Sequence, residues 1–187
     1  MEYLASLRAI PNMLVLRPAD AVEAAECWEI ALGNRTGPSS LIFSRQPLEP
    51  VRADGGENLS RRGAYVLAEA EGGPRRATIF ATGSEVALAV KARAQLQADG
   101  VPTAVVSMPC WGLFEDQDEA YRRDVIGRDT VRVAVEAAVR LGWDRYIGAE
   151  GGFVGMSTFG ASGAEDDIWV HFGITPERVA EEVRKRL

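Results

Sequence analysis

An arginine that follows an apolar run is the first candidate for chemistry in this sequence. Arg45 comes directly after the strand-like residues 41–44. Ligands of α/β proteins gather at the carboxyl ends of the strands, and a guanidinium group placed there can bind a phosphate through two hydrogen bonds. The alternative is an exposed arginine that contacts only solvent. Arg45 is therefore a candidate phosphate-binding residue.

A second candidate is the turn Thr82-Gly-Ser-Glu85, which follows a predicted strand and opens a predicted helix. Backbone N–H groups at a helix start point outward, and the helix dipole favours anions there. Gly83 and Ser84 are therefore candidate anion-binding residues. The alternative is that Thr82 and Glu85 only cap the helix.

Two other features carry no assigned chemistry. The glycine-dense residues 151–163 either wrap a ligand or a partner subunit, or turn a corner under the last helix. His171, the only histidine, stands among large apolar neighbours and is expected to be structural. No Cys/His cluster has metal-ligand spacing, and no phosphate-loop, dinucleotide or nucleophile-elbow motif is present. The sequence therefore predicts no catalytic residue and no metal ligand.

Composition excludes some classes of partner. The chain of 187 residues has a formal net charge of -6 and an apolar fraction of 47%. Nucleic acid needs a clustered cationic face, and no apolar run reaches the roughly 18–20 residues of a membrane span. The N-terminus lacks the features of a secretory signal. We therefore expect a cytoplasmic protein in which Cys27 and Cys110 are buried free thiols rather than a disulfide.

The first 45 residues predict a strand–helix–strand unit, which is parallel in most proteins. The strands are residues 13–16 and 39–44, and the helix begins at Asp20 with Glu23 in a capping-box pattern. One helical face collects Ala21, Ala25, Trp28 and Leu32. Such a unit does not cover the edges of its own sheet. Residues 46–62, with proline, glycine and little periodicity, predict a linker.

The rest of the chain alternates strands and helices. The predicted strands are residues 64–68, 77–81, 103–107 and 131–135, with Tyr146 and Ile147 starting a last short one. The predicted helices are residues 85–98, with Leu88, Ala89, Ala92 and Leu96 on one stripe, residues 116–125, and a last helix from Thr175 with Val179, Val183 and Leu187 buried. This alternation predicts an α/β sandwich of mostly parallel strands.

Several strings in this order resemble the transketolase family. Three resemble the end of its pyrimidine-binding domain, namely residues 4–12 (LASLRAIPN), 17–20 (RPAD) and 41–46 (LIFSRQ). Four resemble its C-terminal domain, namely residues 81–85 (ATGSE), 106–109 (VSMP), 132–136 (RVAVE) and 155–161 (GMSTFGA). The resemblance implies a pyrimidine-domain remnant at 1–45, a linker at 46–62 and a C-terminal domain at 63–187. The implied C-terminal fold has three α/β/α layers and an antiparallel first strand.

The resemblance also implies a function. Transketolases transfer a two-carbon ketol unit between sugar phosphates, using thiamine diphosphate and a divalent metal, magnesium or calcium, in a homodimer. The arginine of the SRQ string, here Arg45, binds the substrate phosphate in that family. The Gly-Asp-Gly cofactor motif, the catalytic glutamate and the substrate-contacting histidines of the family are absent, and residues 162–165 lack its usual proline.

We therefore expect this chain to bind no cofactor and to be inactive alone, with structural, dimerisation and phosphate-binding roles. Its partner is either a second copy or an upstream transketolase chain. The alternative function is a stand-alone small-molecule-binding or regulatory module on the same fold.

Overall fold

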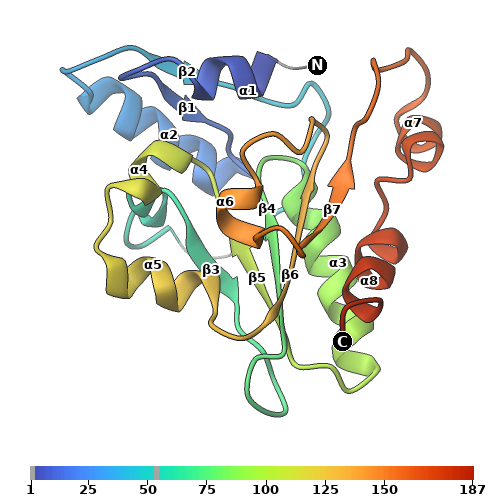
Figure 1. Ribbon diagram of the computed structural model, residues 1–187. Coiled ribbons are helices and arrows are strands. Elements are labelled where there is room, and N and C mark those ends of the chain that lie inside the picture. The colour runs from blue at the N-terminus through green and yellow to red at the C-terminus, as the bar shows by residue number, and fades with distance from the viewer. Residues whose placement is uncertain (1–2, 53–54) are drawn as a thin grey trace.

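The computed structural model describes residues 3–52 and 55–187, which contain two β-sheets (Figure 1). The small sheet is a parallel pair, β1 (Leu14–Leu16) and β2 (Ser39–Leu41). The large sheet has five strands in the order β3-β5-β4-β6-β7. Residues 1, 2, 53 and 54 of the predicted segments 1–45 and 46–62 lie outside the described residues. The division into domains stays a prediction.

The large sheet is mostly parallel, as predicted. Its strands are β3 (Tyr65–Ala68), β4 (Ala77–Ala81), β5 (Thr103–Ser107), β6 (Val131–Glu136) and β7 (Gly152–Gly155). Only β3 runs antiparallel to its neighbour, β5, while β5, β4, β6 and β7 pair in parallel. The strands β4 and β5 are buried along their whole length, which explains their continuous apolar runs.

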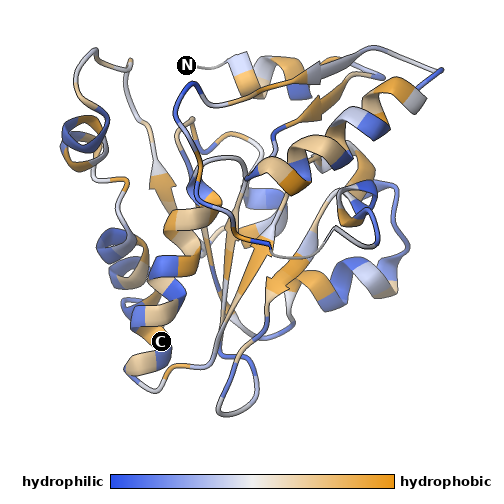
Figure 2. Ribbon diagram, turned by 180° about the vertical axis from the view of Figure 1, so that it is seen from behind, coloured by the Kyte–Doolittle hydropathy of each residue, from blue (hydrophilic) through white to orange (hydrophobic). Residues whose placement is uncertain are grey.

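Helices cover both faces of this sheet and give the expected three layers (Figures 1 and 2). Ile79 of β4 belongs to a core shared with α3 (Glu85–Ala98) and α8 (Pro176–Arg184). Its neighbour Phe80 points to the opposite face, where the core includes α4 (Trp111–Glu115), α5 (Glu119–Ile126) and α6 (Asp144–Ile147). The period-two alternation of a strand therefore separates two cores. The helix α7 (Glu165–Phe172) packs more loosely, through Trp169 and Phe172.

The small sheet carries α1 (Tyr3–Arg8) and α2 (Ala21–Gly33). Asp20 caps α2 by accepting a hydrogen bond from the Glu23 N–H at 2.9 Å, as predicted. Both cysteines are buried and free, also as predicted, and they pack together in one apolar cluster, with Leu16 and Ile30.

The predicted apolar face of α2 is wrong. Ala21, Ala25, Trp28 and Leu32 are all exposed, and the buried positions are Glu23, Glu26, Cys27 and Ile30. The two glutamates are buried because distant donors bind them: Tyr65 and Ser107 donate to Glu23, and Arg52 and Ser60 donate to Glu26. Hydrogen bonds to these carboxylates, rather than apolar side chains, fix this face.

Several boundaries also differ from the sequence-based expectation. The strand expected at 39–44 ends at Leu41, and the helix expected at 116–125 is α5, Glu119–Ile126, with the unexpected short helix α4 before it. Tyr146 and Ile147 end α6 instead of starting a strand, and the last strand, β7, lies inside the glycine-dense segment. Leu187 is exposed, while Val179 and Val183 are buried.

The segment expected as a linker is partly fixed to α2. Asp20 accepts hydrogen bonds from the N–H groups of Val51 and Arg52, and Glu26 accepts them from Leu59 and Ser60. A short 3₁₀ helix follows at Leu59–Arg62. Within residues 3–52 and 55–187, no helix combines the length and the apolar character that crossing a bilayer requires.

Candidate functional site

Arg45 lines a cavity of about 280 Å³ where the N-terminal segment meets the large sheet. Arg45 lies in a bend four residues after the end of β2. Ala137 and Met156 come from the carboxyl ends of β6 and β7, and Trp169 and Phe172 come from α7. The cavity therefore lies at the edge of the sheet where α/β proteins bind ligands.

The chemistry of this cavity is one cation beside an apolar wall. The Arg45 side chain is exposed and forms no hydrogen bond or ion pair with the described residues. Glu165 is the one carboxylate among the described residues that line the cavity. An arginine without an internal partner can bind an external anion without first breaking an ion pair. The geometry is compatible with the predicted role of Arg45, which stays a prediction.

Groups of the protein itself surround the second candidate, Gly83 and Ser84. Gly83 has φ 60°, and a Cβ atom there would lie 2.9 Å from the Arg17 side chain. The Gly83 N–H donates to the Arg17 carbonyl at 3.1 Å, and the Arg17 guanidinium donates to the Thr82 carbonyl at 2.7 Å. Ser84 is half-buried and its side chain makes no capping bond to α3. Binding of an external anion by Gly83 and Ser84 stays a prediction.

The alternative reading of this turn, in which Thr82 and Glu85 cap α3, is wrong. The N-cap residue is Ser84. The Thr82 hydroxyl donates to the Arg17 carbonyl at 3.3 Å. The Glu85 carboxylate accepts two hydrogen bonds from Arg17, at 2.5 and 3.0 Å, and one from the N–H of Ala137 at 3.2 Å.

A second buried carboxylate extends this ion pair into a network. Glu136, at the end of β6, accepts hydrogen bonds from both terminal nitrogens of Arg8 at 2.9 and 2.7 Å, and from the Trp143 indole at 2.8 Å. The Arg17 guanidinium lies 3.5 Å from the same carboxylate. Arg8 also lies over the Trp111 ring, 3.8 Å from its centre. Two arginines of the N-terminal segment are thus bound by two carboxylates of the large sheet and its helix.

Opposite charges shift the pKa values of two groups in this network. Burial alone raises the pKa of Glu136, but the hydrogen bonds and charge of Arg8, together with Arg17 and Trp143, bring this pKa below its ordinary value. Burial lowers the pKa of Arg17, yet the charge and hydrogen bonds of Glu85 outweigh it and leave this pKa raised. The network therefore joins the N-terminal segment to the large sheet and its helix α3.

Sequence reasoning did not identify this network. Arg8, Arg17, Glu85 and Glu136 all lie within the strings that resemble the family, but their spacing does not show which of them pair. His171 is exposed on α7 with its ring against Phe172, so the expected apolar surroundings are only partial. No cluster of three or more His, Cys, Asp or Glu in the described ranges could hold a metal ion. The described residues therefore offer no ligand cluster for the metal of a thiamine cofactor.

Two family models match the chain in succession. Residues 1–50 match "Transketolase, pyrimidine binding domain" and residues 63–175 match "Transketolase-like TK C-terminal domain". The chain belongs to the transketolase family. A transketolase of Sinorhizobium medicae is 57% identical over the whole chain, which covers 27% of that relative. The chain thus spans about a quarter of the length of the curated transketolases that it matches.

Solved transketolases share this fold. A structure from Leishmania mexicana superposes with a TM-score of 0.90 at 39% identity, over 98% of this chain and 26% of that one. A Pichia stipitis transketolase in complex with sedoheptulose 7-phosphate superposes with a TM-score of 0.89 at 35% identity, over 99% of this chain and 26% of that one. The sequence-based resemblance and the expected α/β fold are both confirmed.

Proposed function

We propose that this chain is the C-terminal part of a transketolase, which transfers a two-carbon ketol unit from a ketose phosphate to an aldose phosphate. The observation that carries the proposal is the ordered match of both transketolase domains, supported by 57% identity over the whole chain to one transketolase. Arg45 binds the substrate phosphate in this proposal, and Gly83 and Ser84 are a second candidate for an anion. None of the described residues has a catalytic role.

The cofactor of the proposed reaction is thiamine diphosphate with magnesium or calcium. This cofactor supplies the carbanion chemistry, and the protein around it supplies positioning and electrostatics. The described residues offer no metal-binding cluster. In this proposal other parts of the complete enzyme hold the cofactor, and the 187-residue polypeptide alone is inactive.

The proposed partners are sugar phosphates and either a second copy or an upstream transketolase chain. Neither nucleic acid nor a membrane is a proposed partner, in line with the net charge of -6. The proposed location is the cytoplasm.

Reconstitution tests this function. The 187-residue chain is assayed with xylulose 5-phosphate, ribose 5-phosphate, thiamine diphosphate and magnesium, first alone and then fused behind the remaining part of the Sinorhizobium medicae enzyme. We expect turnover only from the fusion. Turnover by the chain alone would contradict the inactive role, and a folded but inactive fusion would favour the stand-alone module. The remaining part of the enzyme without this chain is the control.

A further inference from the structure

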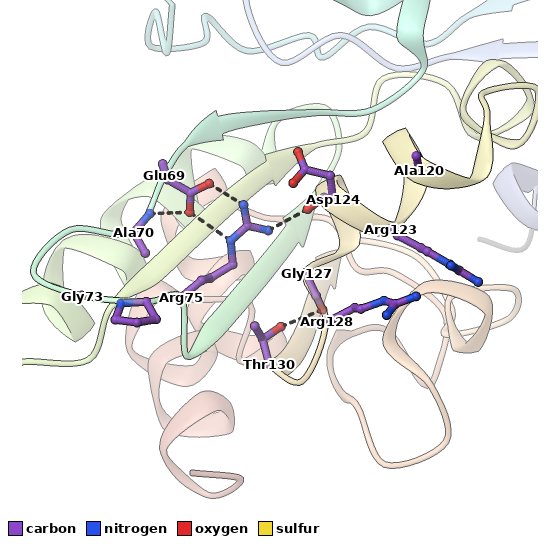
Figure 3. Close-up of a pocket in the computed structure, with 11 residues that line it drawn as sticks. Glu69, Ala70, Gly73, Arg75, Ala120, Arg123, Asp124, Gly127, Arg128 and Thr130 are labelled. Carbon is purple, nitrogen blue, oxygen red and sulfur yellow. Dashed lines mark hydrogen bonds and ion pairs between the residues drawn. The ribbon is translucent and has the colours of Figure 1, made fainter.

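Figure 3 shows the residues that line a second cavity. This cavity lies at the end of the large sheet opposite to the Arg45 cavity. Its volume is about 780 Å³, and an adjoining hollow adds about 460 Å³. Arg75 and Thr130 stand just before β4 and β6, so the cavity lies at the amino ends of these strands. We call the two volumes together the α5–β6 hollow, because the turn between these elements, residues 127–130, borders both.

One wall of this hollow is electrically neutral. The Arg75 guanidinium forms a two-point ion pair with Glu69 (Figure 3). It also donates to the carbonyls of Asp124 and Val125 at the end of α5, both at 3.2 Å. Arg75 therefore has internal partners for its charge and also satisfies the carbonyls that a helix leaves unpaired at its end.

The other wall carries two available cations, Arg123 and Arg128. Each of these arginines lines the cavity and the adjoining hollow. Arg123 pairs with Glu119 on the same helix, but more than half of each side chain is exposed. Such exposed ion pairs contribute little to stability, so another anion can replace the glutamate at small cost. Arg128 has no hydrogen bond or ion pair with any residue in the described ranges. Figure 3 shows both side chains extending in the same direction.

The groups around the hollow carry both signs of charge. Arg132 borders the adjoining hollow and donates one hydrogen bond to the Tyr146 carbonyl at 3.0 Å. The carboxylates that border the hollow are Glu69, Asp124 and Asp129. With Glu119, which pairs with Arg123, four arginines and four carboxylates surround the hollow, so the groups that favour an anion there are the unpaired Arg128 and the weakly held Arg123.

The turn itself adds donors. Asp129 has φ 56° and Gly127 has φ 75°, so the chain reverses direction within a few residues. The backbone N–H groups of Arg128, Asp129 and Thr130 make no hydrogen bond to the described part of the chain. Successive unpaired N–H groups beside guanidinium groups are a common setting for a bound phosphate.

We propose that the α5–β6 hollow binds the phosphate group of a small organic phosphate, held by Arg123, Arg128 and the turn N–H groups. A six-residue strand, β6, separates this site from the Arg45 cavity, which corresponds to roughly 20 Å. The two sites can therefore be filled at the same time. This proposal does not depend on the transketolase reaction.

Calorimetry and NMR on the 187-residue chain test the site. The probes are inorganic phosphate, fructose 6-phosphate and AMP, with fructose as the unphosphorylated control, at physiological ionic strength so that weak surface attraction is screened. We expect saturable binding of one phosphate probe or more, and shifts of the amide signals of residues 127–130. The tighter of fructose 6-phosphate and AMP then identifies a sugar or a nucleotide as the source of the phosphate.

Single variants connect binding to the named residues. Arg128→Gln and Arg123→Gln should each weaken binding by about tenfold or more, because each removes a charge-assisted contact. Arg178→Gln is the matched control, since Arg178 is also an exposed helical arginine in an ion pair with a neighbouring glutamate. Binding is compared only among variants whose melting temperature equals that of the parent chain.

Three results would overturn the proposal. One is no saturable binding of any phosphate probe. Another is equal weakening by Arg178→Gln. The third is loss of binding in Arg45→Gln with amide shifts near residue 45 but none at 127–130, because the phosphate would then occupy the other cavity.

Discussion

Arg45 follows the small sheet and lines a cavity at the carboxyl ends of β6 and β7. Its side chain is exposed and has no partner among the described residues. In a complete enzyme, Arg45→Ala should raise the KM for phosphorylated sugars about ten- to a hundredfold. That range corresponds to roughly 1.5–3 kcal/mol for one charge-assisted hydrogen bond. Steady-state kinetics with phosphorylated and unphosphorylated acceptors measure the effect. Unphosphorylated acceptors should be nearly unaffected, because they never use the contact.

Arg35→Ala is the control for this prediction, since Arg35 is also an exposed arginine of the N-terminal segment. Neither variant should change the melting temperature much, because an exposed side chain contributes little to the core. An equal loss with both kinds of acceptor, or a large fall in melting temperature for Arg45→Ala, would show that Arg45 has a structural role.

Glu136 gives a prediction for pH. Its pKa is lowered in the folded protein, so the unfolded chain binds more protons as the pH falls below the ordinary glutamate pKa of about 4.3. The stability from Glu136 is therefore present above that value and is lost as the pH falls through the folded pKa. At neutral pH, Glu136→Gln should cost about 3–5 kcal/mol, because it leaves Arg8 buried without its charge partner. Urea unfolding between neutral and acid pH measures both effects.

The decisive quantity is the gap, the difference in free energy of unfolding between the parent chain and the Glu136→Gln variant. This gap should narrow as the pH falls, because protonation removes the same charge from the parent. Glu181→Gln is the control, since Glu181 also has a lowered pKa, owing first to hydrogen bonds from Lys185 and Arg178, but is exposed. Its gap should stay small at every pH. A Glu136→Gln gap that is constant with pH would mean that Glu136 is not ionised in the folded chain.

At the scale of elements, the sequence predicts best what depends on continuous burial. The strands β4 and β5 were predictable because both of their faces are covered, so every position is apolar or small. The face of α2 was not predictable, because Glu23 takes its donors from Tyr65 and Ser107, 42 and 84 residues away. Local periodicity carries no information about partners at that distance. The pairing of Arg8 with Glu136 was not predictable for the same reason, since these residues are 128 positions apart.

Strand β7 was missed for a different reason. It begins and ends with glycine, which is depleted in strands, so its sequence resembles a loop. A Cβ atom at Gly155 would lie 2.5 Å from the Glu136 carbonyl, so this position needs glycine for β7 to lie beside β6. Likewise, the sequence singled out Arg45 as a candidate, although β2 ends four residues before it, and its cavity wall from α7 was not foreseeable, because that wall is over 120 residues away.

The segment between the sheets gives a prediction for proteolysis. Trypsin should cleave first after Arg45, which is exposed, and slowly after Arg52, which is buried beside Glu26 with their side chains 2.8 Å apart. Glu26→Gln should accelerate cleavage after Arg52, because it removes the charge that holds this arginine and weakens the anchor of Ser60. Mass spectrometry of early fragments identifies the sites.

Glu29→Gln is the control for this experiment, since Glu29 lies on the same helix and pairs with Arg61 while more than half of each side chain is exposed. It should leave the rate after Arg52 unchanged. First cleavage within residues 77–135 of the parent chain would contradict the expectation that the large sheet and its helices form the stable unit.

At the scale of the whole molecule, exposed apolar side chains concentrate in the N-terminal segment. Five of the nine large exposed hydrophobic residues in the described ranges lie before residue 46, namely Tyr3, Ile10, Trp28, Leu32 and Phe43. Trp28 and Phe43 stack on each other with ring centres 6.3 Å apart. The adjacent two-stranded sheet also leaves strand edges unpaired among the described residues. Such a surface is typical of an interface.

We therefore predict that the 187-residue chain associates with itself through this surface when no other chain covers it. Trp28 and Phe43 are each about half exposed, so together they can bury a further area of roughly 150–250 Å², a part of the roughly 800 Å² that each partner of a stable complex contributes. The double variant Trp28→Ser, Phe43→Ser should shift the chain towards monomer in multi-angle light scattering. Phe159→Ser, which removes an even more exposed ring from the C-terminal part, should not. A parent chain that stays monomeric at all concentrations would show that this surface does not mediate self-association. Dissociation by Phe159→Ser alone would place the interface elsewhere.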